Sequence, residues 1–163
     1  MREHYQVIPG IFRYTSFSHI KKTFYYIFDN NNSYEGTVSQ VKLHPIETKP
    51  FSVGSAKIIP LEIIHGKMSI LGYKFDRFAY VTDCSELPKE THEQLRGIDL
   101  LILNALRYDP HPTHFHLGKS LEAIEGLKPK RAILTHMTHQ IDHQKTELPE
   151  NVELAYDGMV VES

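Results

Sequence analysis

Histidine is the residue type that this sequence uses most unusually. Eleven histidines occur among 163 residues, and six of them lie between positions 111 and 143. Those six are His111, His114, His116, His136, His139 and His143. Imidazole nitrogens bind metals such as zinc, and imidazole exchanges protons near neutral pH. The cluster therefore predicts a metal site, and a histidine-rich pH switch is an alternative that only the composition favours.

Three residues that can bind metals stand directly after predicted strands. His65 follows the apolar run 58–64, Asp83 follows 78–82, and His136 follows 131–135. In α/β sheets, catalytic groups gather where strands end and loops begin. A single histidine at a strand end is usually structural. Three such groups beside a histidine cluster instead favour one shared site for a metal such as zinc.

Strands and helices alternate along the chain from residue 57 onward. Apolar and β-branched runs predict strands at 58–64, 69–75, 78–82, 98–103 and 131–135. Helices are expected at 89–96, where Pro88 suits the first turn, and at 117–127, where leucine and isoleucine recur at helical spacing. This alternation indicates an α/β fold with helices packed on a mixed sheet.

The two ends of the chain carry weaker patterns. Asp157-Gly158 predicts a hairpin between strands at 152–156 and 159–161. Near the start, 24–28 and 38–46 are expected to be extended, with a loop at 29–33, where asparagine and serine side chains compete for backbone hydrogen bonds.

Five short segments occur in an order that resembles a known family. They are Tyr-Val-Thr-Asp-Cys-Ser at 80–85, Leu-Asn-Ala-Leu-Arg at 103–107, Pro-Thr-His-Phe-His-Leu at 112–117, Leu-Thr-His-Met-Thr-His at 134–139 and Asp-Gly-Met at 157–159. From about residue 24 to the end, the chain resembles the C-terminal half of a metallo-β-lactamase-fold hydrolase. The nearest branch is the phosphoribosyl cyclic phosphodiesterase of phosphonate breakdown. The resemblance implies one partial domain over 1–163, an incomplete αββα sandwich.

The same resemblance assigns roles to four residues. His65 corresponds to a ligand of the first metal, Asp83 to the carboxylate that bridges two metals, and His136 to the last ligand of the second metal. His114 corresponds to the histidine that steadies the phosphate or the leaving group. The implied reaction is phosphodiester hydrolysis by a metal-bound hydroxide, with zinc or manganese as the cofactor and a small phosphorylated or cyclic phosphodiester as the substrate.

The other histidines of the cluster receive lesser roles. His139 is expected to support the metal ligands from the second shell. His116 is expected at the surface or in the pocket wall, and His111 and His143 are expected to contribute only to solvation.

One motif of the family is absent from these 163 residues. The family signature His-x-His-x-Asp-His supplies most of the metal ligands, whereas the one His-x-His here, at 114–116, is followed by no Asp-His. His65, Asp83 and His136 alone are too few for two tightly bound zinc ions. We therefore expect a truncated or split hydrolase that is impaired by itself. The alternative is a degenerate, non-catalytic binding or interaction module.

Composition excludes several classes of function. Eighteen Lys and Arg against twenty Asp and Glu give a net charge of −2, which offers no strong signal for nucleic acid. No apolar stretch approaches the roughly 18 residues that span a membrane. The start lacks the pattern of a signal peptide and Cys84 is the single cysteine, which favours the cytoplasm. Because an incomplete sandwich would expose apolar strands, we expect a homodimer.

Overall fold

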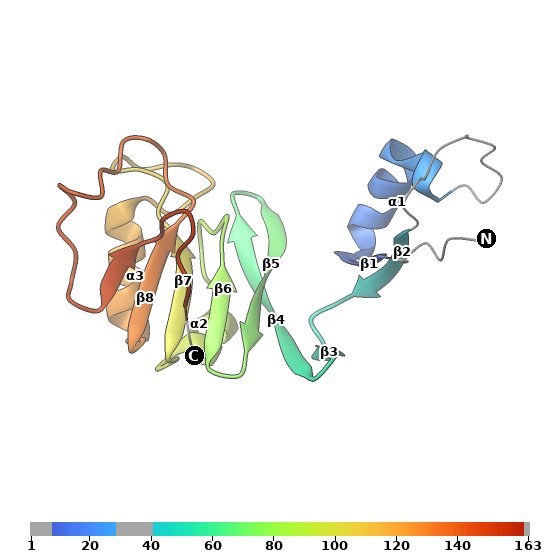
Figure 1. Ribbon diagram of the computed structural model, residues 1–163, viewed down its shortest axis with the longest axis horizontal. Coiled ribbons are helices and arrows are strands. Elements are labelled where there is room, and N and C mark those ends of the chain that lie inside the picture. The colour runs from blue at the N-terminus through green and yellow to red at the C-terminus, as the bar shows by residue number, and fades with distance from the viewer. Residues whose placement is uncertain (1–7, 29–40, 162–163) are drawn as a thin grey trace. The chain divides into compact units, whose positions relative to one another are not determined.

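The computed structural model describes residues 8–28 and 41–161. The chain divides into two compact units, Met1–Lys49 and Pro50–Ser163 (Figure 1). In the first unit, strands β1 (Ile8–Arg13) and β2 (Val41–Ile46) pair in parallel, and helix α1 (Tyr14–Thr23) follows β1 directly.

The prediction of an extended segment at 24–28 is wrong. Tyr25–Ile27 form the 3₁₀ helix η1, in which the Ile27 N–H donates to the Phe24 carbonyl and the Phe28 N–H to the Tyr25 carbonyl. Aromatic residues favour strands when they can pack on a pleated surface. Here Tyr25 is 61% exposed and the segment continues directly from α1, so local helical hydrogen bonds form instead. The loop predicted at 29–33 lies outside the described residues.

The second unit is built on a sheet of seven strands in the order β3-β4-β5-β6-β7-β8-β9. The strands are β3 (Phe51–Val53), β4 (Ala56–His65), β5 (Met68–Phe75), β6 (Phe78–Val81), β7 (Leu100–Asn104), β8 (Arg131–Thr135) and β9 (Val152–Leu154). Pairing is antiparallel from β3 to β6 and parallel from β6 to β9. The predicted mixed sheet is confirmed.

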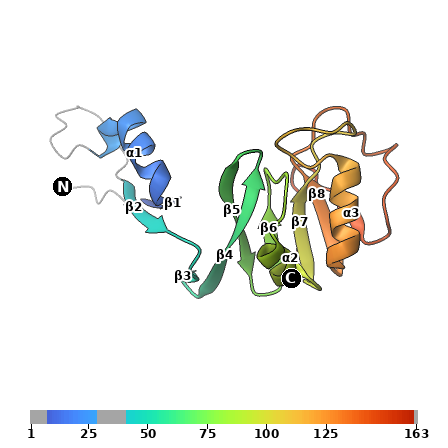
Figure 2. The same ribbon diagram turned by 180° about the vertical axis from the view of Figure 1, so that it is seen from behind.

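Two helices cover one face of this sheet. Helix α2 (Lys89–Leu95) lies between β6 and β7 in the chain, and α3 (Leu117–Leu127) lies between β7 and β8. Connections between neighbouring parallel strands are almost always right-handed, so successive crossovers in the same direction place their helices on the same face (Figure 2). Alternate strand residues such as Val81, Leu103 and Leu134 are fully buried in the core. The predicted α/β architecture is thereby confirmed.

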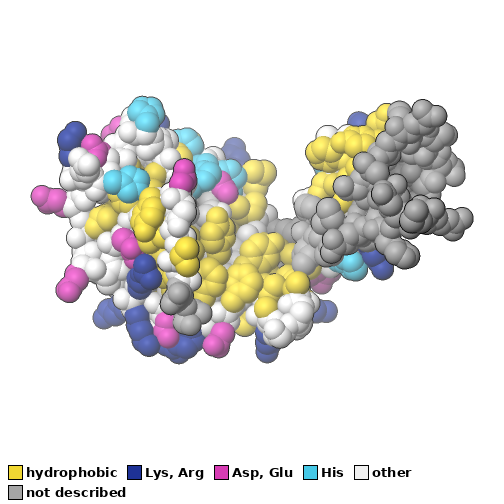
Figure 3. Space-filling view, viewed as in Figure 1, with side chains coloured by type: hydrophobic (Ala, Val, Ile, Leu, Met, Phe, Trp, Pro, Cys, Tyr) yellow, Lys and Arg dark blue, Asp and Glu magenta, His cyan; other side chains and the backbone are white. Residues whose placement is uncertain are grey.

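The opposite face of the sheet carries apolar side chains as well. On β6, buried Ala79 and Val81 alternate with Phe78 and with Tyr80, which is 43% exposed. Figure 3 shows hydrophobic side chains gathered over the strands on this face. Within the described residues, no helix of this unit packs there, and the expected homodimer stays a prediction.

The hairpin predicted near the end is wrong in its second strand. β9 ends at Leu154, and the Met159 N–H donates to the Tyr156 carbonyl in a turn. A two-residue type I′ turn needs positive φ at both central positions. Gly158 has φ +84°, but Asp157 is not among the residues with positive φ, so the chain turns without forming a strand at 159–161.

No helix within the described residues is long and apolar enough to cross a membrane.

Candidate active site

The direction of the strands brings the predicted site residues to one edge of the sheet. β4, β6, β7 and β8 all run the same way, so their carboxyl ends meet at that edge. His65 ends β4, Asp83 follows β6, and His136 follows β8. His114 lies in the segment between β7 and α3.

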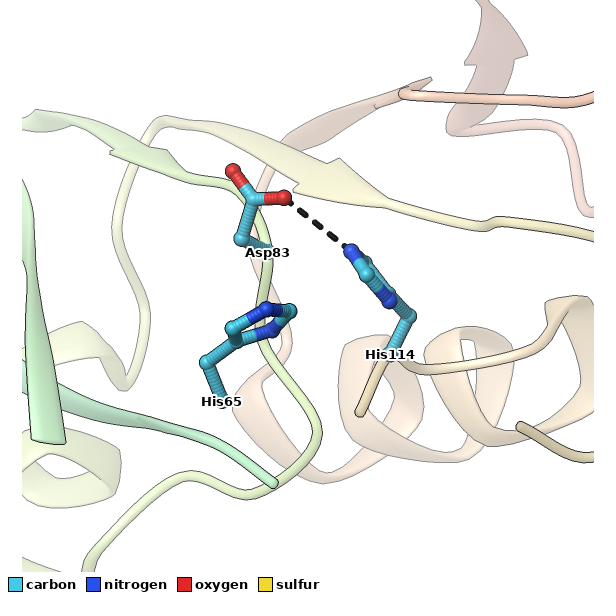
Figure 4. Close-up of side chains that lie close together, drawn as sticks. All are labelled: His65, Asp83 and His114. Atoms are coloured by element: carbon cyan, nitrogen blue, oxygen red, sulfur yellow. Dashed lines mark hydrogen bonds and ion pairs between the residues drawn. The ribbon is translucent and has the colours of Figure 1, made fainter. Parts of the chain in front are cut away.

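Asp83 is at the centre of this cluster. Its Oδ1 lies 3.0 Å from His114 Nε2 and 3.3 Å from His136 Nε2. The His114 ring stacks on His136 at 4.9 Å, and the His65 ring meets His114 edge-on at 4.7 Å. Figure 4 shows His65, Asp83 and His114 around a common space. The structure therefore brings together the four residues to which the family resemblance assigns a direct role.

Two of these residues have an unusual backbone. Asp83 has φ +57° and His136 has φ +58°, the left-handed region that non-glycine residues rarely adopt. Such a conformation costs of order 1–3 kcal/mol and persists where surrounding contacts enforce it. At this edge of the sheet, the left-handed conformation changes the direction of the backbone just after β6 and just after β8. Strain of this kind collects at functional sites.

A buried asparagine enforces the turn that carries Asp83. Asn104 ends β7 with no exposed surface, and its Oδ1 accepts the Cys84 N–H at 2.8 Å. Its Nδ2 donates to the carbonyls of Cys84 and Phe115, at 3.1 and 3.4 Å. One side chain thus joins the Asp83 loop to the segment that carries His114.

Ser85 joins the same loop to the β4–β5 turn. Its hydroxyl donates to the Ile64 carbonyl at 3.0 Å and accepts the Gly66 N–H at 2.9 Å. These bonds flank His65 on both sides. Between Asp83 and Ser85, burial raises the pKa of the Cys84 thiol to about 12, so this cysteine stays protonated and is not a nucleophile.

Among the other histidines between positions 111 and 143, His111 contacts this centre. His111 Nδ1 is 3.3 Å from His114 Nδ1, and the two rings are 5.2 Å apart. The prediction that His111 contributes only to solvation is therefore wrong. Partial burial, together with the positive charge of Arg107, holds the pKa of His111 below its ordinary value.

His139 is exposed and makes no described contact with the cluster, so its supporting role stays a prediction. His116 precedes α3 as its N-cap. His143 Nε2 is 2.9 Å from the Ala155 carbonyl, just after β9. The prediction that His143 contributes only to solvation did not anticipate this hydrogen bond.

Sequence reasoning missed the residues that hold the cluster in place. It gave no role to Asn104, Ser85 or Thr113, although all three lie inside or beside the quoted motifs. Asn104 carried a usable signal, because a polar residue directly after an apolar strand needs hydrogen-bond partners when it is buried.

The donor set fits a borderline divalent cation. Ligand atoms of His65, Asp83 and His114 all lie within 4.8 Å of one another, and His136 Nε2 lies 3.3 Å from the same carboxylate. Imidazole nitrogen and carboxylate oxygen are ligands that zinc prefers, and manganese accepts them too.

Comparison with known proteins places the chain in a family. The profile described as "Beta-lactamase superfamily domain" matches residues 1–137. This chain belongs to the metallo-β-lactamase superfamily. The predicted family and fold are therefore confirmed.

Among solved structures, a diphosphatase of the PhnP family is similar to the chain with 37% identity and a TM-score of 0.85. The match covers 94% of this chain and 57% of the diphosphatase. YhfI from Bacillus subtilis matches with 16% identity and a TM-score of 0.71, over 99% of this chain and 68% of YhfI. Zn²⁺-bound PqqB from Methylobacterium extorquens matches with 11% identity and a TM-score of 0.73, over 98% of this chain and 66% of PqqB. The last two share the fold alone.

An octanoyltransferase from Porphyromonas gingivalis is 33% identical over 145 residues. That match covers 86% of this chain but only 29% of the octanoyltransferase. The chain thus spans little more than half of the diphosphatase and under a third of the octanoyltransferase.

Proposed function

We propose that this chain carries one side of the active site of a metal-dependent hydrolase that cleaves phosphodiesters or related diphosphates in small molecules. The observation that carries the proposal is the arrangement around Asp83. Two imidazole Nε2 atoms lie 3.0 and 3.3 Å from the same carboxylate oxygen, and His65 stands beside them. The diphosphatase that is 37% identical to the chain over the matched region supports phosphorus as the centre attacked.

In this proposal His65, Asp83 and His136 hold zinc or manganese. Bound cations of this kind activate water and neutralise phosphoryl oxygens. Asp83 supplies the negative charge of the described cluster, and its side chain is 42% exposed, so the carboxylate is open to ligands. His114, whose side chain is only 12% exposed, directs Nε2 at Asp83 in this structure and would transfer the hydrogen bond of that N–H to the departing oxygen when substrate is bound.

We also propose that the chain by itself is impaired. Three donors cannot fill the coordination shells of two cations, which in structural and catalytic zinc sites take three or four protein ligands each. The 163 residues contain no His-x-His-x-Asp-His motif to complete the set. A reducing compartment such as the cytoplasm suits the free thiol of Cys84.

The experiment compares the chain with a chimera. The chimera adds the part of the diphosphatase that the chain does not cover, and both proteins are tested for zinc content after dialysis and for turnover of an aryl phosphodiester and a diphosphate. We expect weak zinc binding and negligible turnover from the chain, and both activities in the chimera. Asp83→Ala should abolish zinc binding. His143→Ala should not, because His143 is exposed and its described hydrogen bond goes to the Ala155 carbonyl and not to Asp83.

A folded chimera that holds two zinc ions but hydrolyses neither substrate would contradict the proposal. That result would favour the second candidate, a non-catalytic binding module, for which the absent motif is the supporting observation. Octanoyl transfer is not proposed, because the chain matches only 29% of the octanoyltransferase and its one cysteine is buried.

A further inference from the structure

Thr113 lies between two of the imidazoles and contacts both of their loops. Its main-chain carbonyl is 2.9 Å from His65 Nδ1, and its hydroxyl is 2.8 Å from His114 Nδ1. Its methyl group packs against the β4–β5 turn, where a Cβ placed on Gly66 would lie 2.8 Å from Thr113 Cγ2. Two groups of this one residue thus contact the imidazoles, and a third lies against the turn next to His65.

The carbonyl determines which nitrogen of His65 carries the proton. A main-chain carbonyl only accepts hydrogen bonds, so the Nδ1 of His65 must be the donor. In a neutral ring this leaves the Nε2 of His65 with a free lone pair, the form in which imidazole binds a metal.

The Thr113 hydroxyl and Asp83 together determine the tautomer of His114, which is opposite to that of His65. An ionised carboxylate only accepts, so His114 Nε2 donates to Asp83 Oδ1 at 3.0 Å. The Nδ1 of a neutral His114 is then an acceptor, and the Thr113 hydroxyl donates to it. That hydroxyl is also 3.2 Å from His111 Nδ1, but its single proton goes to the nearer His114.

We propose that Thr113 is a positioning residue that orients His65 and His114 in opposite tautomers, one with a lone pair on Nε2 and the other with a proton there. The centroids of the two rings are 4.7 Å apart. The opposite tautomers make His65 a metal ligand and His114 a hydrogen-bond donor. The roles of His65 as a metal ligand and His114 as a donor rest on the proposed function. The tautomers and the contacts of Thr113 do not.

The first test reads the tautomers directly. Nitrogen-15 NMR of the metal-free chain, labelled at histidine and kept alkaline enough for neutral rings, should show the proton on Nδ1 of His65 and on Nε2 of His114. Thr113→Val keeps the size and the carbonyl but removes the hydroxyl. It should shift the Nδ1 resonance of His114 most and that of neighbouring His111 less, while the resonances of His65 stay in place; Thr113→Ser should restore the His114 resonance. A wild-type His65 with its proton on Nε2 would overturn the proposal without any variant.

The second test uses the contact with Gly66. Gly66→Ala should lower the affinity for zinc by about tenfold, the lower end of what lost support of a metal ligand costs. Gly66→Ala combined with Thr113→Ser removes the methyl group that the new Cβ would strike, so it should recover most of that affinity. Gly54→Ala is the control, because Gly54 has a similar φ of +58° with nothing within 4 Å of the new Cβ.

Equal loss of zinc affinity in the single and double variants, with both folded, would overturn the role of this contact. If the wild-type chain bound no zinc at all, the proposed metal site would fail, and the NMR spectra alone would decide the role of Thr113.

Discussion

The two edges of the seven-stranded sheet place their charged groups by different means. At the carboxyl-end edge, Asp83 and His136 sit in left-handed conformations, and the buried amide of Asn104 holds the Asp83 loop. At the opposite edge, Asp99 pairs with Arg77 and Lys130, whose side chains are 58% and 72% exposed. Exposed pairs of this kind contribute little to stability.

This difference in support distinguishes the candidate active site from an ordinary charged surface. Buried hydrogen bonds to the backbone fix a side chain in one place, and a group that must meet a cation needs such placement. Exposed ion pairs form wherever opposite charges are close, and solvent and salt weaken them. At the carboxyl-end edge, the left-handed residues Asp83 and His136 therefore lie beside a network of buried hydrogen bonds. The left-handed residues near the exposed pairs, Asp76 at φ +51° and Lys128 at φ +53°, instead lie in a turn and at the C-cap of α3.

The largest effect is expected from Asn104→Ala. This change leaves the buried Cys84 N–H without its acceptor and opens a small cavity. The free energy of unfolding should therefore fall by about 3 kcal/mol. Residual zinc binding should fall as well, because the Asp83 loop is no longer fixed. Urea unfolding and zinc titration measure the two effects.

Asn151→Ala is the matched control for that variant. Asn151 is exposed at the opposite edge, and the described hydrogen bond of its side chain runs from Nδ2 to the Pro129 carbonyl at 3.2 Å. Asn151→Ala should lower the free energy of unfolding by well under 1 kcal/mol. Equal destabilisation by the two variants would remove the distinction between the edges.

A middle-sized effect is expected from glycine and alanine at the left-handed positions. At position 136, glycine should be more stable than alanine by about 1 kcal/mol, because alanine is strained at φ +58°. Asp76→Gly and Asp76→Ala should differ by a similar amount. Both variants at 136 should reduce zinc binding, while neither variant at 76 should, as thermal unfolding and zinc titration can show.

If alanine and glycine at position 136 were equally stable, the backbone there would have relaxed, and the strain at the site edge would not be maintained by its surroundings.

Local patterns in the sequence predicted most of the second unit. The helix at 117–127 and the strand at 131–135 agree with α3 and β8, because their apolar spacing is a local property. The predicted strand at 152–156 continued two residues too far, since its pairing with the distant strand β8 ends at Leu154.

The chemistry of the site was predictable from residue types, but its support was not. Asp83 and His136 follow apolar strands, and parallel strands must end at the same edge. The roles of Asn104 and Thr113 depend on hydrogen bonds across 20 and 48 positions in the chain, to Cys84 and His65. No local pattern determines which distant backbone group such a residue will meet.

The smallest effect is expected from Asp99→Asn at the opposite edge. The hydrogen bond from Arg77 holds the pKa of Asp99 at about 2, below its ordinary 3.8. A lowered pKa contributes stability above the ordinary value and loses it as the pH falls through the lowered one. The unfolding midpoints of wild type and variant should therefore differ slightly at neutral pH and converge between pH 4 and about pH 2. Arg77→Gln should move this convergence to higher pH, and added salt should shrink the difference. A large, salt-insensitive difference would mean that this edge, like the one around Asp83, is held by more than exposed charges.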